Sequence, residues 1–253
     1  MKTIGVIGAG SMGSGIAQIA ASNGCKVLLY DNNSSALDLA LEKLKKILTR
    51  LVEKGRIDNN KMEKILSLIQ TTQSLTDFSA TDLVIEAIVE DLDIKKKVFS
   101  ELDSICAKST ILATNTSSLS VTSIASACTH ADRVIGIHFF NPAPLMPLVE
   151  IIPCIQSSNE TIHKSKDLID SWAKVTVLAK DTPGFIVNRI ARPFYGEALR
   201  IYEEGIANFE TIDCAMTQIG GFKMGPFTLM DFIGNDVNYA VTESVFKAFY
   251  YDP

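Results

Sequence analysis

Residues 6–17 read VIGAGSMGSGIA, and the organisation of the whole chain follows from this stretch. A short apolar run at 4–7 breaks into glycines with G-x-G-x-x-G spacing, and a helical pattern follows them. This order predicts a first strand, a tight turn and a first helix. In such a turn Gly8 permits the sharp bend, Gly10 lets a pyrophosphate approach the bare backbone, and Gly13 lets the helix pack closely on the strand.

The motif alone does not establish a dinucleotide site, because a glycine-rich turn that binds no ligand can have the same spacing. Here a second apolar run, 26–30, follows the helix and ends at Asp31. An acid at this place accepts hydrogen bonds from the adenine-side ribose and repels a 2′-phosphate, and no Arg or Lys follows nearby to receive one. The N–H groups at the helix start, around Ser11 and Met12, would face the phosphates. We therefore expect a dinucleotide site that takes NAD rather than NADP.

Composition limits the remaining possibilities. The chain has 253 residues, 47% of them hydrophobic and 21% charged, as in an ordinary globular protein with a substantial core. The formal net charge of −5 gives no basis for a nucleic-acid surface. No apolar run approaches the roughly 20 residues that cross a bilayer, and the early first strand leaves no room for a signal peptide. Neither a nucleic acid nor a membrane is expected as a partner.

The five cysteines are scattered and lack C-x-x-C spacing. This pattern indicates reduced, mostly buried thiols in a cytoplasmic protein, and it gives no ground for a metal site. They are Cys25, Cys106, Cys128, Cys154 and Cys214.

Apolar runs alternate with helical patterns as far as residue 180, which predicts a doubly wound α/β domain with a mostly parallel sheet. Further strands are expected at 71–72, 83–87, 110–113, 134–138, 148–152 and 175–178. Helices are expected at 34–55, with Ser34 as its cap, and at 61–69, 91–106 and 159–174. The first two of these helices form a helical hairpin inserted between the second and third strands.

The pattern changes at Asp181, where the turn DTPG is followed by helical spacing alone. Helices are expected at 185–204, 209–220 and 231–251. We therefore predict a Rossmann-type domain at 1–180 and an all-α domain at 181–253. The last helix has no obvious C-cap, so the helical domain is expected to be incomplete.

Four polar residues are candidates for catalysis. Ser117 and His138 follow or end strands, at the edge of the sheet where ligands bind. Glu150 is an acid in an otherwise apolar strand, and Asn188 lies in the first helix after the domain boundary. Each also has an ordinary interpretation: His138 as a core histidine, Ser117 as a helix cap and Asn188 as a buried structural amide.

Pairing His138 with Glu150 explains both unusual placements. An imidazole is suited to exchanging an alcohol proton near neutral pH. A carboxylate in an apolar strand is costly unless it is paired, and beside the ring it would fix the tautomer and stabilise the imidazolium. Ser117 and Asn188 could then hydrogen-bond the reacting oxygen.

A basic strip lies on the polar side of the predicted helix at 34–55, and it consists of Lys43, Lys45, Lys46, Arg50 and Lys54. Such a strip is usually a solvated helix face. The alternative is that it meets an anionic part of the substrate.

At this point the sequence resembles the 3-hydroxyacyl-CoA dehydrogenase family, most closely its bacterial short-chain, 3-hydroxybutyryl-CoA branch. The resemblance covers essentially the whole chain. Its motifs are GAGSMG at 8–13, EAIVE at 86–90, TNTSS at 114–118, HFFNP at 138–142, DTPGFIVNR at 181–189 and MGPF at 224–227 followed by Asp231.

The resemblance implies a Rossmann-type domain, a helical domain used for dimerisation, and NAD-linked interconversion of (S)-3-hydroxyacyl-CoA and 3-oxoacyl-CoA. It implies that His138 is the catalytic base, that Glu150 is its partner, and that Ser117 and Asn188 contact the substrate oxygen. It places Glu90, Lys95, Asn115 and Asn141 along the cleft for NAD and substrate. Arg50 and Lys54 fall where coenzyme A contacts lie in the family. It also implies that the helical domain of other family members has further residues after the position that corresponds to Pro253.

Two other functions remain open from the residues. A dehydrogenase of a free 3-hydroxy acid would need an arginine for the carboxylate and would have no use for the basic strip. An inactive NAD-binding structural homologue would have the same fold, but the intact set of four catalytic candidates argues against it.

Overall fold

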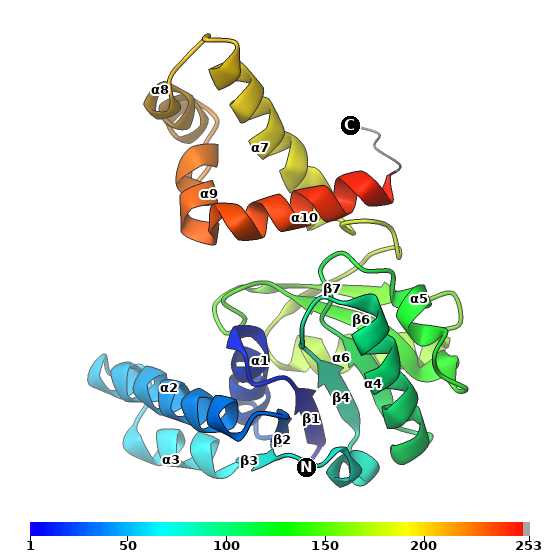
Figure 1. Ribbon diagram of the computed structural model, residues 1–253. Helices are drawn as coiled ribbons and strands as arrows, with labels where there is room; N and C mark the ends of the chain where they lie inside the picture. Colours follow the sequence, from blue (N-terminus) through cyan, green and yellow to red (C-terminus); the bar gives the residue numbers. More distant parts are fainter. Residues whose placement is uncertain (250–253) are drawn as a thin grey trace. The chain divides into compact units, whose positions relative to one another are not determined.

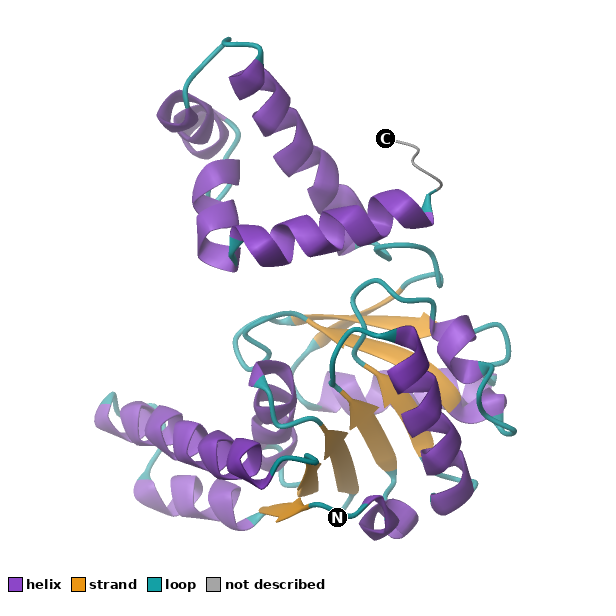
Figure 2. Ribbon diagram, in the orientation of Figure 1, coloured by secondary structure: helices purple, strands orange, loops and turns teal. Residues whose placement is uncertain are grey.

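The computed structural model describes residues 1–249, and its contacts divide the chain into two compact units, Met1–Asp181 and Thr182–Pro253. The sequence placed a boundary near residue 181. Figures 1 and 2 show a unit of strands and helices and a unit of helices alone. Within the described residues, no helix combines the length and apolar character that crossing a bilayer requires.

The first unit is built on an eight-stranded sheet with strand order β3-β2-β1-β4-β5-β6-β7-β8. All neighbouring strands run parallel except β6 and β7, which pair antiparallel. This confirms the predicted mostly parallel sheet. The strands are β1 Thr3–Ile7, β2 Lys26–Tyr30, β3 Ile69–Thr72, β4 Leu83–Glu86, β5 Ile111–Thr114, β6 Val134–Phe139, β7 Leu148–Pro153 and β8 Val175–Leu178.

Helices cover both faces of this sheet (Figure 1). The helices of the first unit are α1 Ser11–Ser22, α2 Ser34–Glu53, α3 Asn59–Ser67, α4 Leu92–Ile105, α5 Val121–Ala125 and α6 Asn159–Ser171, with short 3-10 turns at Leu75–Ala80 and Ala131–Arg133. One core cluster joins α1, α2 and α6 to alternate residues of the strands, including Ile135, Ile137 and Val149. Because side chains alternate along a strand, the residues between them, His138 and Glu150 included, point to the opposite face, beside α4 and α5.

The ends of several helices differ from the sequence expectations by a few residues, as at α2 and α3. Asn33, not Ser34, caps α2, because its side-chain oxygen accepts the Ser35 N–H at 3.0 Å. The next helix begins at Asn59 and is capped by Asp58, and Ile69 belongs to β3 instead of to that helix. The hairpin of α2 and α3 lies between β2 and β3 in the chain, as predicted.

The second unit consists of α7 Val187–Glu203, α8 Phe209–Cys214 continued by a π-helical turn at Ala215–Ile219, α9 Pro226–Ile233 and α10 Asn235–Ala248. The single helix predicted at 231–251 is wrong: Gly234, with φ of +98°, separates α9 from α10. Such a conformation favours glycine and interrupts the helical hydrogen bonding. The part of that prediction beyond residue 249 lies outside the described residues.

Candidate active site

The glycine-rich turn after β1 has the geometry that a dinucleotide phosphate needs. Gly8 has φ of +102°, and a Cβ there would lie 2.5 Å from the carbonyl oxygen of Ala87. A Cβ on Gly13 would lie 1.8 Å from the Gly8 oxygen, so only glycine lets α1 approach the turn. Around Gly10 no atom lies within 4 Å of a Cβ position, and no side chain caps the start of α1. An anion can therefore reach these helix N–H groups, which fits NAD.

Asp31 at the end of β2 is fixed against this turn. Its Oδ2 accepts the Ala9 N–H at 2.8 Å, and its Oδ1 accepts the Asn33 N–H at 3.0 Å. The carboxylate thus lies beside the glycine-rich turn and retains acceptor capacity for ribose hydroxyls.

His138 and Glu150 form a buried pair across the antiparallel strands β6 and β7. The two residues are directly opposite in the register, and His138 Nδ1 lies 2.7 Å from Glu150 Oε2. Their side chains are 6% and 0% exposed. An ionised carboxylate can only accept, so Nδ1 carries the proton and Nε2 is the atom that can take one from a substrate. The Phe140 ring packs against the imidazole, with 4.5 Å between ring centroids.

The loop after β5 carries Asn115 and Ser117 to the same edge of the sheet. Asn115 donates its N–H to the Glu86 carbonyl at 2.8 Å, and its Oδ1 accepts the Phe139 N–H at 2.8 Å. This second bond joins the loop to the residue that follows His138. The loop with Ser117 and the end of β6 with His138 are therefore neighbours, as the strand-end argument predicted.

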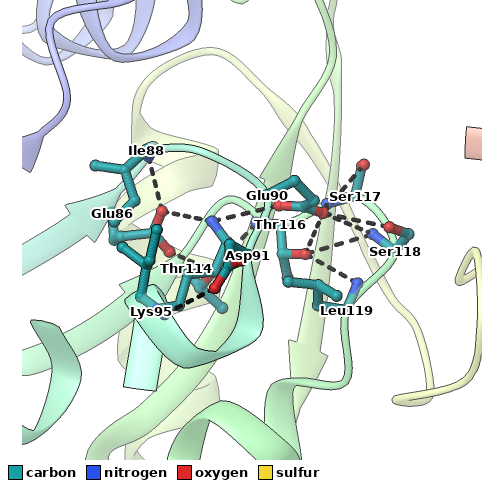
Figure 3. A network of polar contacts seen from close by, with 11 residues as sticks. Glu86, Ile88, Glu90, Asp91, Lys95, Thr114, Thr116, Ser117, Ser118 and Leu119 are labelled. Carbon is teal, nitrogen blue, oxygen red and sulfur yellow. Dashed lines mark hydrogen bonds and ion pairs between the residues drawn. The ribbon is translucent and has the colours of Figure 1, made fainter. Parts of the chain in front are cut away.

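A charged network holds this loop from the side of β4 (Figure 3). Glu90 Oε1 accepts the Ser117 N–H at 3.0 Å and the Thr116 hydroxyl at 2.5 Å. Burial would raise the pKa of the Glu90 carboxyl, but the Lys95 ammonium and these hydrogen bonds outweigh it and hold that pKa below its ordinary value. Lys95 is itself only 1% exposed, with Nζ 2.6 Å from Glu86 Oε1 and 3.3 Å from Glu90 Oε2.

Glu86 is the charged residue of this network that the site prediction missed. It is fully buried at the end of β4, and its Oε2 accepts the Thr114 hydroxyl at 2.8 Å. The signal was available in the sequence, because an acid ending an apolar strand is the same anomaly that drew attention to Glu150.

The remaining predicted site residues are spread over the chain. Asn141 is exposed after β6, and Asn188 lies in the first turn of α7, in the second unit. Arg50 and Lys54 are exposed at the C-terminal end of α2. Arg50 also lines an open depression of about 400 Å³ on that helix, together with Glu42, Lys45, Lys46, Thr49 and Glu53. The cofactor and substrate contacts assigned to these four residues, and to Lys95, stay predictions.

Two family models together span the chain. The model described as "3-hydroxyacyl-CoA dehydrogenase, NAD binding domain" matches residues 3–182, and the model of the C-terminal domain of the same family matches residues 184–253.

Curated relatives agree with these models. The chain is 46% identical over 250 residues to 3-hydroxyadipyl-CoA dehydrogenase of Escherichia coli K12, covering 99% of this chain and 53% of that protein. It is 46% identical over 246 residues to 3-hydroxybutyryl-CoA dehydrogenase of Clostridioides difficile, covering 97% of this chain and 88% of that protein. The chain thus spans about half the length of the first relative and most of the second.

Among solved structures, the (S)-3-hydroxybutyryl-CoA dehydrogenase PaaH1 of Ralstonia eutropha superposes with a TM-score of 0.96 at 39% identity. That match covers 100% of this chain and 89% of the other. A 3-hydroxybutyryl-CoA dehydrogenase structure from Escherichia coli K12 gives a TM-score of 0.97 at 45% identity, with 99% of this chain and 53% of the other covered.

Proposed function

The chain belongs to the 3-hydroxyacyl-CoA dehydrogenase family, and on this premise we propose that it interconverts (S)-3-hydroxyacyl-CoA and 3-oxoacyl-CoA thioesters with NAD. The observation that carries the proposal is the 2.7 Å contact between His138 Nδ1 and Glu150 Oε2 at the ligand-binding edge of the sheet. It provides a base of defined tautomer in the unit that also holds the glycine-rich turn.

Each residue has a separate task in the proposed reaction. His138 Nε2 removes the proton from the 3-hydroxyl, and Glu150 stabilises the imidazolium that results. Ser117 and Asn188 hold the substrate oxygen as its charge changes, so they act by orientation and electrostatics. NAD, when bound through the turn at Gly8–Gly13 and Asp31, supplies the hydride acceptor.

For the substrate, we propose a short acyl chain, with 3-hydroxybutyryl-CoA as the first candidate. The name of the Clostridioides difficile relative supports this choice, while the Escherichia coli relative is named for an adipyl thioester. Arg50 and Lys54 are proposed to meet the phosphates of coenzyme A. We also propose a homo-oligomer formed through the helical unit and a cytoplasmic location, the latter supported by five free thiols.

The test is a kinetic assay that follows NADH consumption with 3-oxoacyl-CoA substrates of increasing acyl length, starting from acetoacetyl-CoA. Each substrate is paired with NADPH as the alternative cofactor and with free acetoacetate as the alternative substrate. Turnover confined to the thioesters with NADH supports the proposal. Preference for the free acid would favour the alternative dehydrogenase, and the absence of all turnover would favour an inactive NAD-binding homologue.

A further inference from the structure

The buried pair of Lys95 and Glu86, and the partly exposed Glu90 beside it, have no part in the proposed proton transfer. We propose that Lys95 is a positioning residue: together with Glu86 and Glu90 it forms a charged brace that fixes the backbone of the Ser117 loop. This inference rests on the proposed function, because it assumes that Ser117 contacts the substrate oxygen.

The brace begins with a fully buried acid on a strand. Glu86 ends β4, and its Oε1 accepts both the Ile88 N–H at 2.7 Å and the Lys95 ammonium at 2.6 Å. Lys95 stands in the first turn of α4, the helix that follows the next loop. Since Ile88 lies in that loop, Glu86 fixes both ends of the connection that carries Glu90.

Glu90 connects Lys95 to the Ser117 loop. Its Oε2 lies 3.3 Å from Lys95 Nζ, while its Oε1 faces a ring of donors from the loop. Besides Thr116 Oγ1 and Ser117 N, these donors are Ser117 Oγ at 3.4 Å, Ser118 N at 3.3 Å and Ser118 Oγ at 3.3 Å. A carboxylate is strongest as an acceptor when ionised, and the lowered pKa of Glu90 keeps it so.

A second path reaches the same loop from Glu86. The Thr114 hydroxyl donates to Glu86 Oε2 at 2.8 Å and accepts the Thr116 N–H at 3.2 Å. Both paths meet at Thr116, the residue immediately before Ser117 (Figure 3). Between them they hold the peptide on either side of the proposed substrate contact.

The typical energies of buried charge pairs and of catalytic misplacement favour a functional reason for the pairing of Lys95 with Glu86. A buried charge pair is often no more stabilising than apolar packing, so stability alone does not explain why Lys95 and Glu86 are buried together at this place. Catalysis, in contrast, is sensitive to placement, and a misplacement of about 1 Å costs on the order of 100-fold in rate. A brace of charge-assisted hydrogen bonds is suited to that requirement.

The test uses the full chain and the variant Lys95→Met. The control is Lys97→Met, which removes the same residue type from an exposed position of α4. We expect Lys95→Met to lower kcat/KM by about tenfold or more through kcat, and by less than about threefold when Ser117→Ala is already present. Lys97→Met should change neither value. If the effects of Lys95→Met and Ser117→Ala multiply, Lys95 does not act through Ser117 and the inference is overturned.

Hydrogen exchange separates this inference from the proposed function, because it needs no turnover. Amides at 115–119 should exchange faster in Lys95→Met than in Lys97→Met. Equal exchange, or a weaker NADH affinity with kcat unchanged, would reject the brace and assign Lys95 to cofactor contact instead. If Lys95→Met does not fold, Glu90→Gln answers the same question: faster exchange of these amides supports the brace, and unchanged exchange rejects it.

Discussion

The two units of the chain differ in how they accommodate charged side chains. Within the described residues only the first unit buries ion pairs, as with His138 and Glu150 or Lys95 and Glu86, although it also has ion pairs at its surface. In the described part of the second unit, the ion pairs lie at the surface, and large apolar side chains are exposed, among them Ile190 at 70% and Phe232 at 69%. The proposed base and its acidic partner therefore lie in the unit with the larger core, and the helical unit has apolar surface that suits the proposed association of copies.

The strongest prediction from this difference concerns the ability of each unit to fold on its own. The core cluster from Ile4 to Trp172 lies entirely within the first unit, while the second buries few apolar side chains of its own. We expect fragment 1–181 to unfold in one cooperative thermal transition and fragment 182–253 to show none at micromolar concentration. Circular dichroism against temperature measures both. A cooperative transition of a monomeric 182–253 fragment would show that its core is sufficient.

The second prediction tests the proposed catalytic role of His138 with a substitution that should leave the fold of the first unit intact. His138→Gln removes the base while keeping the size and polarity of the side chain, so kcat should fall by at least about 100-fold. NADH affinity, measured by fluorescence titration, should persist because the glycine-rich turn is untouched. An unchanged kcat would remove His138 from the mechanism.

A smaller effect concerns the stability of the helical unit. Asp213 accepts the Phe227 N–H at 2.9 Å and the Thr228 N–H at 2.8 Å, so it caps α9 from α8. Burial would raise the pKa of this carboxyl, but the bonds from the Thr228 side chain and from both N–H groups hold it below its ordinary value. Asp213→Asn should cost about 1 kcal/mol near neutral pH.

The sign of the pH dependence follows from that depressed pKa. The stabilisation by Asp213 is fully present above the carboxyl pKa of the unfolded chain and is lost as the pH falls through the lower folded value. Denaturant unfolding should therefore show a difference between the parent chain and Asp213→Asn that vanishes in acid. Asp231→Asn, at an exposed position of α9, is the control. A difference independent of pH would mean that the charge of Asp213 does not contribute.

The smallest effect concerns the surface of α2. If Arg50 and Lys54 meet the phosphates of coenzyme A, replacing either with Ala should raise KM for acetoacetyl-CoA by about two- to fivefold at low salt, and by less at high salt. The control is Lys108→Ala, an exposed lysine just before β5, on the side of the sheet where the parallel strands begin and away from their carboxyl ends. An equal KM in all three variants would assign the strip to an ordinary solvated face.

Local patterns predicted most of the elements because alternation and helical spacing act over neighbouring residues. They failed where a few residues change the outcome. Gly234 separates α9 from α10, where the sequence predicted one helix. The side chain of Asn33, and not that of Ser34, caps α2. The short helix α5 and the 3-10 turns were not predicted, because segments so short have little periodicity.

Four features could be predicted from the amino-acid sequence: the glycine-rich turn after β1, the acid that follows β2, the pairing of His138 with Glu150 and the change to helices after Asp181. Each of these depends on residue type at a fixed spacing, which the chain carries locally. Only the tertiary structure decided what surrounds Lys95 and Glu86. The family resemblance placed Lys95 along the cleft for NAD and substrate and did not single out Glu86. In the fold, Lys95 Nζ lies 2.6 Å from Glu86 Oε1 and 3.3 Å from Glu90 Oε2. A buried charge pairs with an opposite charge that the packed fold brings close to it. Such a partner can be distant in the sequence, so the neighbouring residues do not reveal it.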